Sequence, residues 1–149
     1  MNKLLLVFML TISPCINAQM SDYSDGTSAT GSYSVAMGYN TTASGDQSTA
    51  MGRSSTASGA RSTAMGYNTT ASGINSTAMG RKSVASGYYS TTIGYDTRAS
   101  DFTSTVIGQY NNSLSSITTN GSATSYDADN TAFVIGNGTD DSNRSDAFK

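Results

Sequence analysis

The sequence SVAMGYNTTASGDQ at residues 34–47 decides the fold, because it repeats as STAMGRSSTASGAR at 48–61, STAMGYNTTASGIN at 62–75 and STAMGRKSVASGYY at 76–89. Two weaker copies follow, STTIGYDTRASDFT at 90–103 and STVIGQYNNSLSSI at 104–117. A short period of fixed length is typical of a solenoid, in which each repeat contacts only its neighbours. We therefore assign six 14-residue coils to residues 34–117.

Traces of the unit continue on both sides of these coils. Ala29-Thr30-Gly31 preserves part of it, so we expect an N-terminal cap with a degenerate repeat at residues 19–33. The sequence AFVIG at 132–136 returns in phase, since Ile135 lies 28 residues beyond Ile107. This spacing predicts one degenerate coil between them, and we assign residues 118–149 to that coil and to a segment that ends the repeats.

Each unit divides into two halves, one ending in Ala-Met-Gly and the other in Ala-Ser-Gly, which predicts two short strands joined by glycine-containing turns. A helix is disfavoured, because each interior glycine costs about 1 kcal/mol and the Ser and Thr residues give no compensating preference. Stacked coils would pair each strand with its copy about 4.8 Å away, so six coils would form a rod roughly 29 Å long. The predicted fold class is an all-β solenoid.

Alternation along a strand separates the small residues from the larger apolar ones. A 14-residue coil is narrow, so we expect the alanines to face inward and the column that includes Met51 to face outward. An apolar stripe in water is rare on a monomer, which favours a homo-oligomer interface. The reverse orientation, with the stripe inward, stays open. The predicted interface column consists of Met37, Met51, Met65, Met79, Ile93, Ile107 and Ile135.

Two further sets of side chains are candidates for ligand contact. In the first, Tyr and Arg alternate from coil to coil, which in-register stacking explains because an intervening Tyr separates like charges and offers cation–π contact. The second set is apolar and lies at the most variable corner of the unit, where exposed residues could contact a partner. The first set is Tyr39, Arg53, Tyr67, Arg81 and Tyr95, continued by Gln109, and the second is Ile74, Tyr88, Tyr89 and Phe102.

Composition argues against an enzyme and against nucleic-acid binding. The 149 residues include no His and no Glu, and one Cys, so the usual general bases and nucleophiles are missing. The net charge is only −2, and the basic residues are dispersed. We expect no cofactor, no metal, no small-molecule substrate and no nucleic-acid partner. Asp127-Ala128-Asp129-Asn130 and Asp140-Asp141 could suggest calcium ligands, but turn residues are the preferred interpretation.

The N-terminus has the pattern of a secretory signal peptide, with Lys3 before an apolar run at residues 4–12 and a small-residue exit to Ala18. We assign residues 1–18 to it and expect the mature chain to be exported. The apolar run is shorter than the roughly 20 residues that a membrane-spanning helix needs. Lipid modification of Cys15 is an alternative that Pro14 disfavours.

The repeated S-x-A-M/I-G followed by A-S-G, over residues 29–117, resembles the head repeat of trimeric autotransporter adhesins, the YadA-like head or haemagglutinin-type repeat. The closing stretch FVIGNGT at 133–139 and SNRS at 142–145 resembles the segment with which such heads end. The resemblance implies a single-stranded left-handed parallel β-roll and a homotrimer joined through the apolar column. It also implies display at the outer membrane, on the cell surface or as a secreted protein, and attachment to host matrix proteins or other cell-surface ligands.

Two other interpretations stay open. The stalk and membrane anchor of that family do not occur in these residues, so a trimeric fibre protein without its C-terminal part is one alternative. The other is a monomeric binding solenoid, such as an ice-binding protein, for which the hydroxyl column of Thr49, Thr63, Thr77, Thr91 and Thr105 is the motive.

Overall fold

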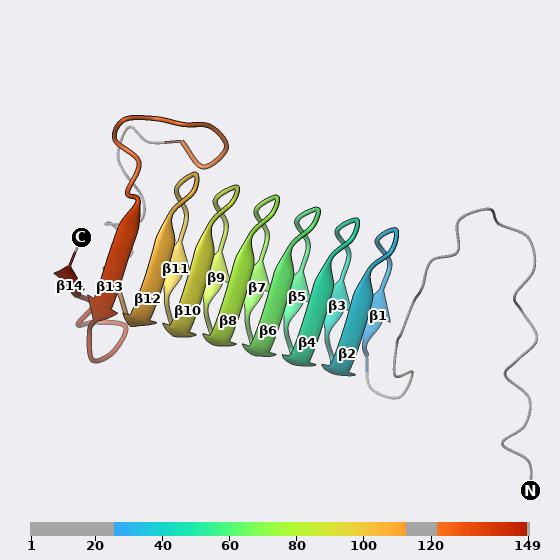
Figure 1. The fold of residues 1–149 in the computed structure, drawn as a ribbon. Helices are drawn as coiled ribbons and strands as arrows, with labels where there is room; N and C mark the ends of the chain where they lie inside the picture. Colours follow the sequence, from blue (N-terminus) through green and yellow to red (C-terminus); the bar gives the residue numbers. More distant parts are fainter. Residues whose placement is uncertain (1–25, 113–121, 149) are drawn as a thin grey trace, which may run out of the picture.

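The computed structural model describes residues 26–112 and 122–148, and in these residues the chain is an all-β solenoid (Figure 1). Each regular coil contributes one strand of five residues and one of two residues. The strands are β1 (Ser28–Ala29), β2 (Val35–Tyr39), β3 (Thr42–Ala43), β4 (Thr49–Arg53), β5 (Thr56–Ala57), β6 (Thr63–Tyr67), β7 (Thr70–Ala71), β8 (Thr77–Arg81), β9 (Val84–Ala85), β10 (Thr91–Tyr95), β11 (Arg98–Ala99), β12 (Thr105–Gln109), β13 (Phe133–Asn137) and β14 (Asp146–Phe148).

The strands form two sheets that run along the solenoid. The long strands build an eight-stranded sheet in the order β14-β13-β12-β10-β8-β6-β4-β2, and the short strands a six-stranded sheet in the order β1-β3-β5-β7-β9-β11. Successive coils pair in parallel with equivalent residues opposite one another, as in Met51 with Met65. The 14-residue coil with two short strands, which the sequence predicted, is confirmed.

The interior of the solenoid contains almost only small side chains. Two alanine columns face inward, and each described member of them within residues 36–99 is completely buried. Buried hydroxyl side chains line the rest of the interior, among them Ser55 and Thr69, whose hydroxyl groups are hydrogen-bonded at 2.9 Å. The predicted inward position of the alanines is therefore confirmed.

Two corners per coil bring the backbones of successive coils into close contact. Gly66 has a φ of +127°, and a Cβ atom added there would lie 1.9 Å from the carbonyl oxygen of Gly80. At the other corner, a Cβ atom on Gly59 would lie 2.1 Å from the carbonyl oxygen of Gly73. Only glycine can occupy such positions without moving the neighbouring coil.

The return of the pattern at residues 132–136 corresponds to one coil, not two. Strand β13 pairs directly with β12, with Ile107 opposite Ile135. Thr105 N donates to Ala132 O at 2.9 Å, 27 residues on, whereas Thr91 N donates to Ser104 O, 13 residues on. The 28-residue spacing therefore reflects an insertion of one unit length that adds no strand among the described residues, and the expected intervening coil was wrong.

The corner of the coil at Asp101 contacts residues of the insertion, and the glycine of the repeat is absent there. Asp101 stands where the preceding coils have glycine, and it is buried. Its carboxylate accepts a hydrogen bond from Thr131 N at 2.8 Å, and Phe102 N donates to Ser122 O at 2.9 Å. No further coil occupies this corner in the described residues, so a side chain can replace the glycine.

At the last strand of the six-stranded sheet, β11, a side chain takes the place of the next strand as the hydrogen-bonding partner. In the regular coils, the first residue of a short strand donates to a backbone carbonyl 13 residues on, as Val84 N does to Thr97 O at 2.8 Å. Arg98 N donates instead to the Asn111 Oδ1 atom at 2.8 Å, and Asn111 Nδ2 donates to Arg98 O at 3.1 Å. The amide of Asn111 thus replaces the next strand and satisfies the edge of β11.

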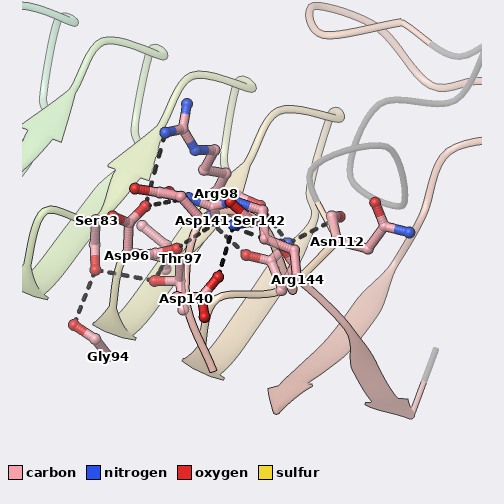
Figure 2. Close-up of polar contacts among 12 residues, drawn as sticks. Ser83, Gly94, Asp96, Thr97, Arg98, Asn112, Asp140, Asp141, Ser142 and Arg144 are labelled. Carbon is pink, nitrogen blue, oxygen red and sulfur yellow. Dashed lines mark hydrogen bonds and ion pairs between the residues drawn. The ribbon is translucent and has the colours of Figure 1, made fainter. Parts of the chain in front are cut away.

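The C-terminal segment closes the same end of the solenoid (Figure 2). Arg144 donates to the Asp96 Oδ1 atom at 2.6 Å and to Asp96 O at 2.9 Å, and it also pairs with Asp141. Burial lowers the pKa of the Arg144 guanidinium, but the hydrogen bonds with Asp96 and Asp141 outweigh it and raise the pKa above its ordinary value. The buried carboxylate of Asp96 is therefore compensated by a permanent cation.

We call these contacts of Arg144 with Asp96 and Asp141 the C-terminal cap, and Tyr110 lies beside it. Its ring meets the ring of Tyr95 edge to face at 4.9 Å, and the Arg144 guanidinium lies 5.5 Å from its centroid. The hydrogen bond with Tyr95, followed by burial, raises the pKa of Tyr110 to about 12. A raised tyrosine pKa favours the neutral form, so its contribution to stability is complete below the ordinary value of 10.0 and is lost as pH rises toward 12.

The expectations for the N-terminus, including the signal peptide and Cys15, fall on residues 1–25 and lie outside the described residues, as does most of the proposed N-terminal cap. Within residues 26–112 and 122–148, no helix has the length and apolar character needed to span a membrane.

We predict that Gly66→Ala strongly destabilises the solenoid, because the new methyl group would collide with the backbone of Gly80 in the next coil. A loss of about 3 kcal/mol or more in the free energy of unfolding is expected. Ser72→Ala, at an exposed position, is the matched control and should change it by less than about 0.5 kcal/mol. Chemical denaturation followed by far-UV circular dichroism measures both; equal stabilities would contradict the close contact.

We predict that Arg144→Gln loosens the C-terminal cap, because it leaves the buried Asp96 carboxylate without its closest cation. Breaking such a pair costs about 3 kcal/mol. Arg98→Gln is the control: Arg98 is 3.7 Å from the same carboxylate but 48% exposed, so its loss should cost less than about 1 kcal/mol. Hydrogen–deuterium exchange of residues 133–148 should accelerate in Arg144→Gln only. Similar exchange in the two variants would show that Arg144 is not the main contact.

Candidate interaction surfaces

The outer face of the eight-stranded sheet carries three parallel columns of side chains. In β4, Thr49, Met51 and Arg53 point outward while Ala50 is buried, and the same pattern recurs in β6 and β8. Because successive strands pair in register, each residue type continues along the sheet in a straight line. The face therefore displays a hydroxyl column, an apolar column and a column of alternating Tyr and Arg.

The apolar column is at the surface, as its size and alternation predicted. Met37 is 39% exposed and Ile93 is 44% exposed, and the other members are partly exposed. The inward orientation that the sequence had left open is therefore wrong for these residues, because alanine fills the interior. The complete column is Met37, Met51, Met65, Met79, Ile93, Ile107 and Ile135, and its role as a trimer interface stays a prediction.

The Tyr and Arg side chains form a continuous stack, which we call the Tyr–Arg ladder: Tyr39, Arg53, Tyr67, Arg81 and Tyr95. The Arg53 guanidinium lies 5.5 Å from the ring centroids of both Tyr39 and Tyr67. The Arg81 guanidinium lies 5.6 Å from that of Tyr67 and 4.9 Å from that of Tyr95. The predicted cation–π contacts are confirmed, and Gln109 continues the column without a charge.

The ladder is open to solvent. Tyr39 is 50% exposed, Tyr67 is 41% exposed, and both arginines are exposed. The ion pairs of the described residues all involve Asp96 or Asp141 with Arg98 or Arg144, so neither Arg53 nor Arg81 is paired with a described carboxylate.

The variable corner presents a second, smaller set of apolar side chains. Tyr89 is exposed, and its ring meets that of Phe102 edge to face at 5.5 Å. Tyr88 and Ile74 are only partly exposed, and Tyr88 N donates to Ala123 O at 2.8 Å. The structure thus joins Tyr89 with Phe102, while the backbone N–H of Tyr88 is hydrogen-bonded to Ala123, a residue of the insertion between β12 and β13.

The aspartates near the C-terminus act as turn residues. Asp140 accepts hydrogen bonds from Ser142 N at 2.8 Å and from Asn143 N at 2.9 Å, and Asp127 accepts one from Asp129 N at 3.0 Å. The side chain of Asn143, followed by Ser142 N, holds the pKa of the Asp140 carboxyl below its ordinary value. In the described parts of the chain, no three His, Cys, Asp or Glu side chains gather closely enough to hold a metal ion.

Sequence reasoning missed the polar closure of the solenoid. Asp96 occupies the corner position that Asn40 and Asn68 hold in other coils, with the same positive φ, so it reads as a turn residue. Its partner Arg144 is 48 residues away. The only available signal was the SNRS sequence at 142–145, which resembled a family segment without indicating what it contacts.

Comparison with known proteins agrees with this architecture. A search of curated proteins found no match to the chain. The family model of the YadA head domain repeat, which spans two copies, matches residues 29–55, 43–69, 57–83 and 71–97. The successive matches advance by 14 residues, the length of one structural coil. The coils from residue 29 to residue 97 are therefore YadA head repeats, and the solenoid that they build is a YadA-like head domain.

Proposed function

We propose that this chain is the head of a surface-displayed or secreted adhesin, which associates as a homotrimer and attaches to host matrix proteins or other cell-surface ligands. The observation that carries the proposal is the straight apolar column on the outside of a YadA-like head domain. YadA head repeats are an adhesin-type family and not an enzyme family. As part of the same proposal, the solenoid is a left-handed roll and the chain is exported to the cell surface, as in the family that it resembles.

The column has the properties of an interface between copies. Full burial of one Met or Ile side chain contributes about 1.5–3 kcal/mol, and seven such side chains are aligned on each chain. All seven lie on one straight face, so parallel copies in the same register would place like residues together along the whole head. Rotational symmetry about an axis parallel to the sheet would bury the column in every copy.

Association would also serve attachment. A single narrow solenoid offers few side chains per coil for a ligand, whereas a symmetric assembly repeats each surface column around its axis. Several weak contacts made at once give an avidity that can exceed the single-site affinity about 100-fold. The columns outside the interface would then be the attachment surface.

We predict that Met51→Asp together with Met65→Asp dissociates the assembly, because it would place two charged side chains of each copy in the buried apolar interface. Light scattering coupled to size exclusion should show a trimer for the unmodified chain and a monomer for the double variant. Thr56→Asp with Thr70→Asp, on the outside of the six-stranded sheet, is the matched control and should remain trimeric.

A double variant that stays trimeric would contradict the interface assignment. An unmodified chain that is monomeric would favour the binding-solenoid alternative, and a thermal-hysteresis assay would then test whether the hydroxyl column that includes Thr49 and Thr63 binds ice.

We further predict that the unmodified chain binds immobilised host matrix proteins, with collagen and fibronectin as the first probes and serum albumin as the control. The monomeric Met51→Asp, Met65→Asp variant should bind about 100-fold more weakly, because it loses multivalency. Surface plasmon resonance measures both. Equal binding to albumin and to the matrix proteins would contradict a specific attachment function.

A further inference from the structure

We infer that the Tyr–Arg ladder binds a linear anionic glycan through Arg53 and Arg81. This inference rests on the proposed attachment function and names a ligand class for it. The ladder combines three properties that recognition of an extended anion requires: cations held in fixed positions, charges that no carboxylate of the described residues neutralises, and a regular spacing.

The aromatic stack fixes the arginines. Each guanidinium lies between two tyrosine rings, at 5.5 and 5.5 Å for Arg53 and at 5.6 and 4.9 Å for Arg81. A free arginine side chain loses rotamer entropy when a ligand immobilises it. The tyrosines have already imposed much of that loss during folding, so more of the charge interaction remains available for binding.

The charge on the ladder is not compensated within the described residues. The solenoid at residues 26–112 has five basic and three acidic side chains, a balance of 5 − 3 = +2, although the whole chain has a net charge of −2. Residues 122–148 have one basic and five acidic side chains, a balance of 1 − 5 = −4. Asp96, which directly follows Tyr95 of the ladder in the sequence, is already bound by Arg144. An anionic ligand would therefore meet two unpaired guanidinium groups on the positive part of the molecule.

The spacing of the charges favours a glycan. Arg53 and Arg81 belong to β4 and β8, two strands apart in the sheet, so they are separated by about 9.6 Å. A linear glycan in which a uronic acid alternates with an uncharged sugar carries one carboxylate every two rings, a repeat of similar length. Guanidinium binds carboxylate with two parallel hydrogen bonds, and the exposed tyrosine hydroxyl groups could donate to the intervening sugar.

Single-stranded nucleic acid fits the ladder less well. Proteins that bind it stack the bases on open aromatic faces. Both faces of Tyr67 are covered, one by Arg53 and the other by Arg81, at 5.5 and 5.6 Å from the ring centroid. A ligand must therefore be recognised by its charges and hydroxyl groups at the outer edge of the stack.

The ladder is compatible with the proposed trimer. It lies two residues along each strand from the apolar column, so it would border the buried interface and be repeated three times around the assembly. Three ladders on parallel axes would give a long glycan several attachment points.

The test measures binding of the full chain to hyaluronan, a uronic-acid glycan, by surface plasmon resonance. Arg53→Gln together with Arg81→Gln should reduce the affinity about tenfold or more. Arg53→Lys with Arg81→Lys should also reduce it, because lysine keeps the charge but loses the paired hydrogen bonds. Arg61→Gln is the matched control: Arg61 is exposed on the opposite corner, donates to Asn75 at 2.8 Å, and should leave the affinity unchanged within about twofold.

Three results would overturn the inference: no binding of hyaluronan by the unmodified chain, an equal loss in Arg61→Gln, or binding of single-stranded poly(dT) as tight as that of hyaluronan. Light scattering on every variant separates this inference from the proposed function. A trimer that attaches to matrix protein but not to hyaluronan overturns the ladder assignment alone. A monomer that binds hyaluronan through Arg53 and Arg81 contradicts the trimer and supports the ladder.

Discussion

The structure depends on the contact between the backbones of successive coils at their two glycine corners. A Cβ atom at Gly59 or Gly66 would lie about 2 Å from a carbonyl oxygen of the next coil, closer than any side chain allows. The glycines therefore let the coils approach to the distance at which every strand pairs with its neighbour. They also fix the register, because a coil of another length would place a side chain opposite one of these carbonyls. Every column on the outside of the molecule follows from that register.

Because the strands pair strictly in register, equivalent residues of neighbouring coils lie next to one another, which would bring like charges together. The sequence avoids this by alternating two residue types from one coil to the next, so that some positions repeat only every second coil. On the outside, Tyr and Arg alternate, so that Arg53 and Arg81 are separated by Tyr67. On the inside, Ser and Thr alternate with the same phase. Ser55 and Ser83 accept hydrogen bonds from Thr69 and Thr97 at 2.9 Å and donate to glycine carbonyl groups of the following coil. These interior hydrogen bonds join each coil that carries Arg to the following coil that carries Tyr.

The repeating part of the fold could be predicted from sequence because one period and one difference in side-chain size determine it. The inward alanines, the outward Met51 column and the contacts of Arg53 all follow from a 14-residue coil with alternating faces. The ends could not be predicted, because there the repeat is replaced by single contacts. Asn111 substitutes for a strand with its side chain, and Arg144 reaches Asp96 across 48 residues. The 28-residue spacing between Ile107 and Ile135 wrongly predicted an intervening coil, because an insertion of one unit length gives the same sequence spacing as a stacked coil. The repeat does not identify a ligand-binding surface in the same way, because the exposure of a side chain does not indicate which partner it contacts.

The narrow interior links the stability of the solenoid to its assembly. Burial of an alanine methyl group contributes only about 0.8 kcal/mol, whereas ordering the backbone of one residue costs about 1–2 kcal/mol. Apart from Val106, Val134 and Tyr110, the fully or nearly fully buried apolar side chains of the described residues are alanines, so the interior contributes little apolar burial. Backbone hydrogen bonds between coils and burial on the outside must supply more of the stability than in a domain with a large core. The Met and Ile column is a continuous apolar surface on the outside of the described residues. Association through that column would therefore stabilise the fold itself, and the melting temperature of the head should rise with protein concentration.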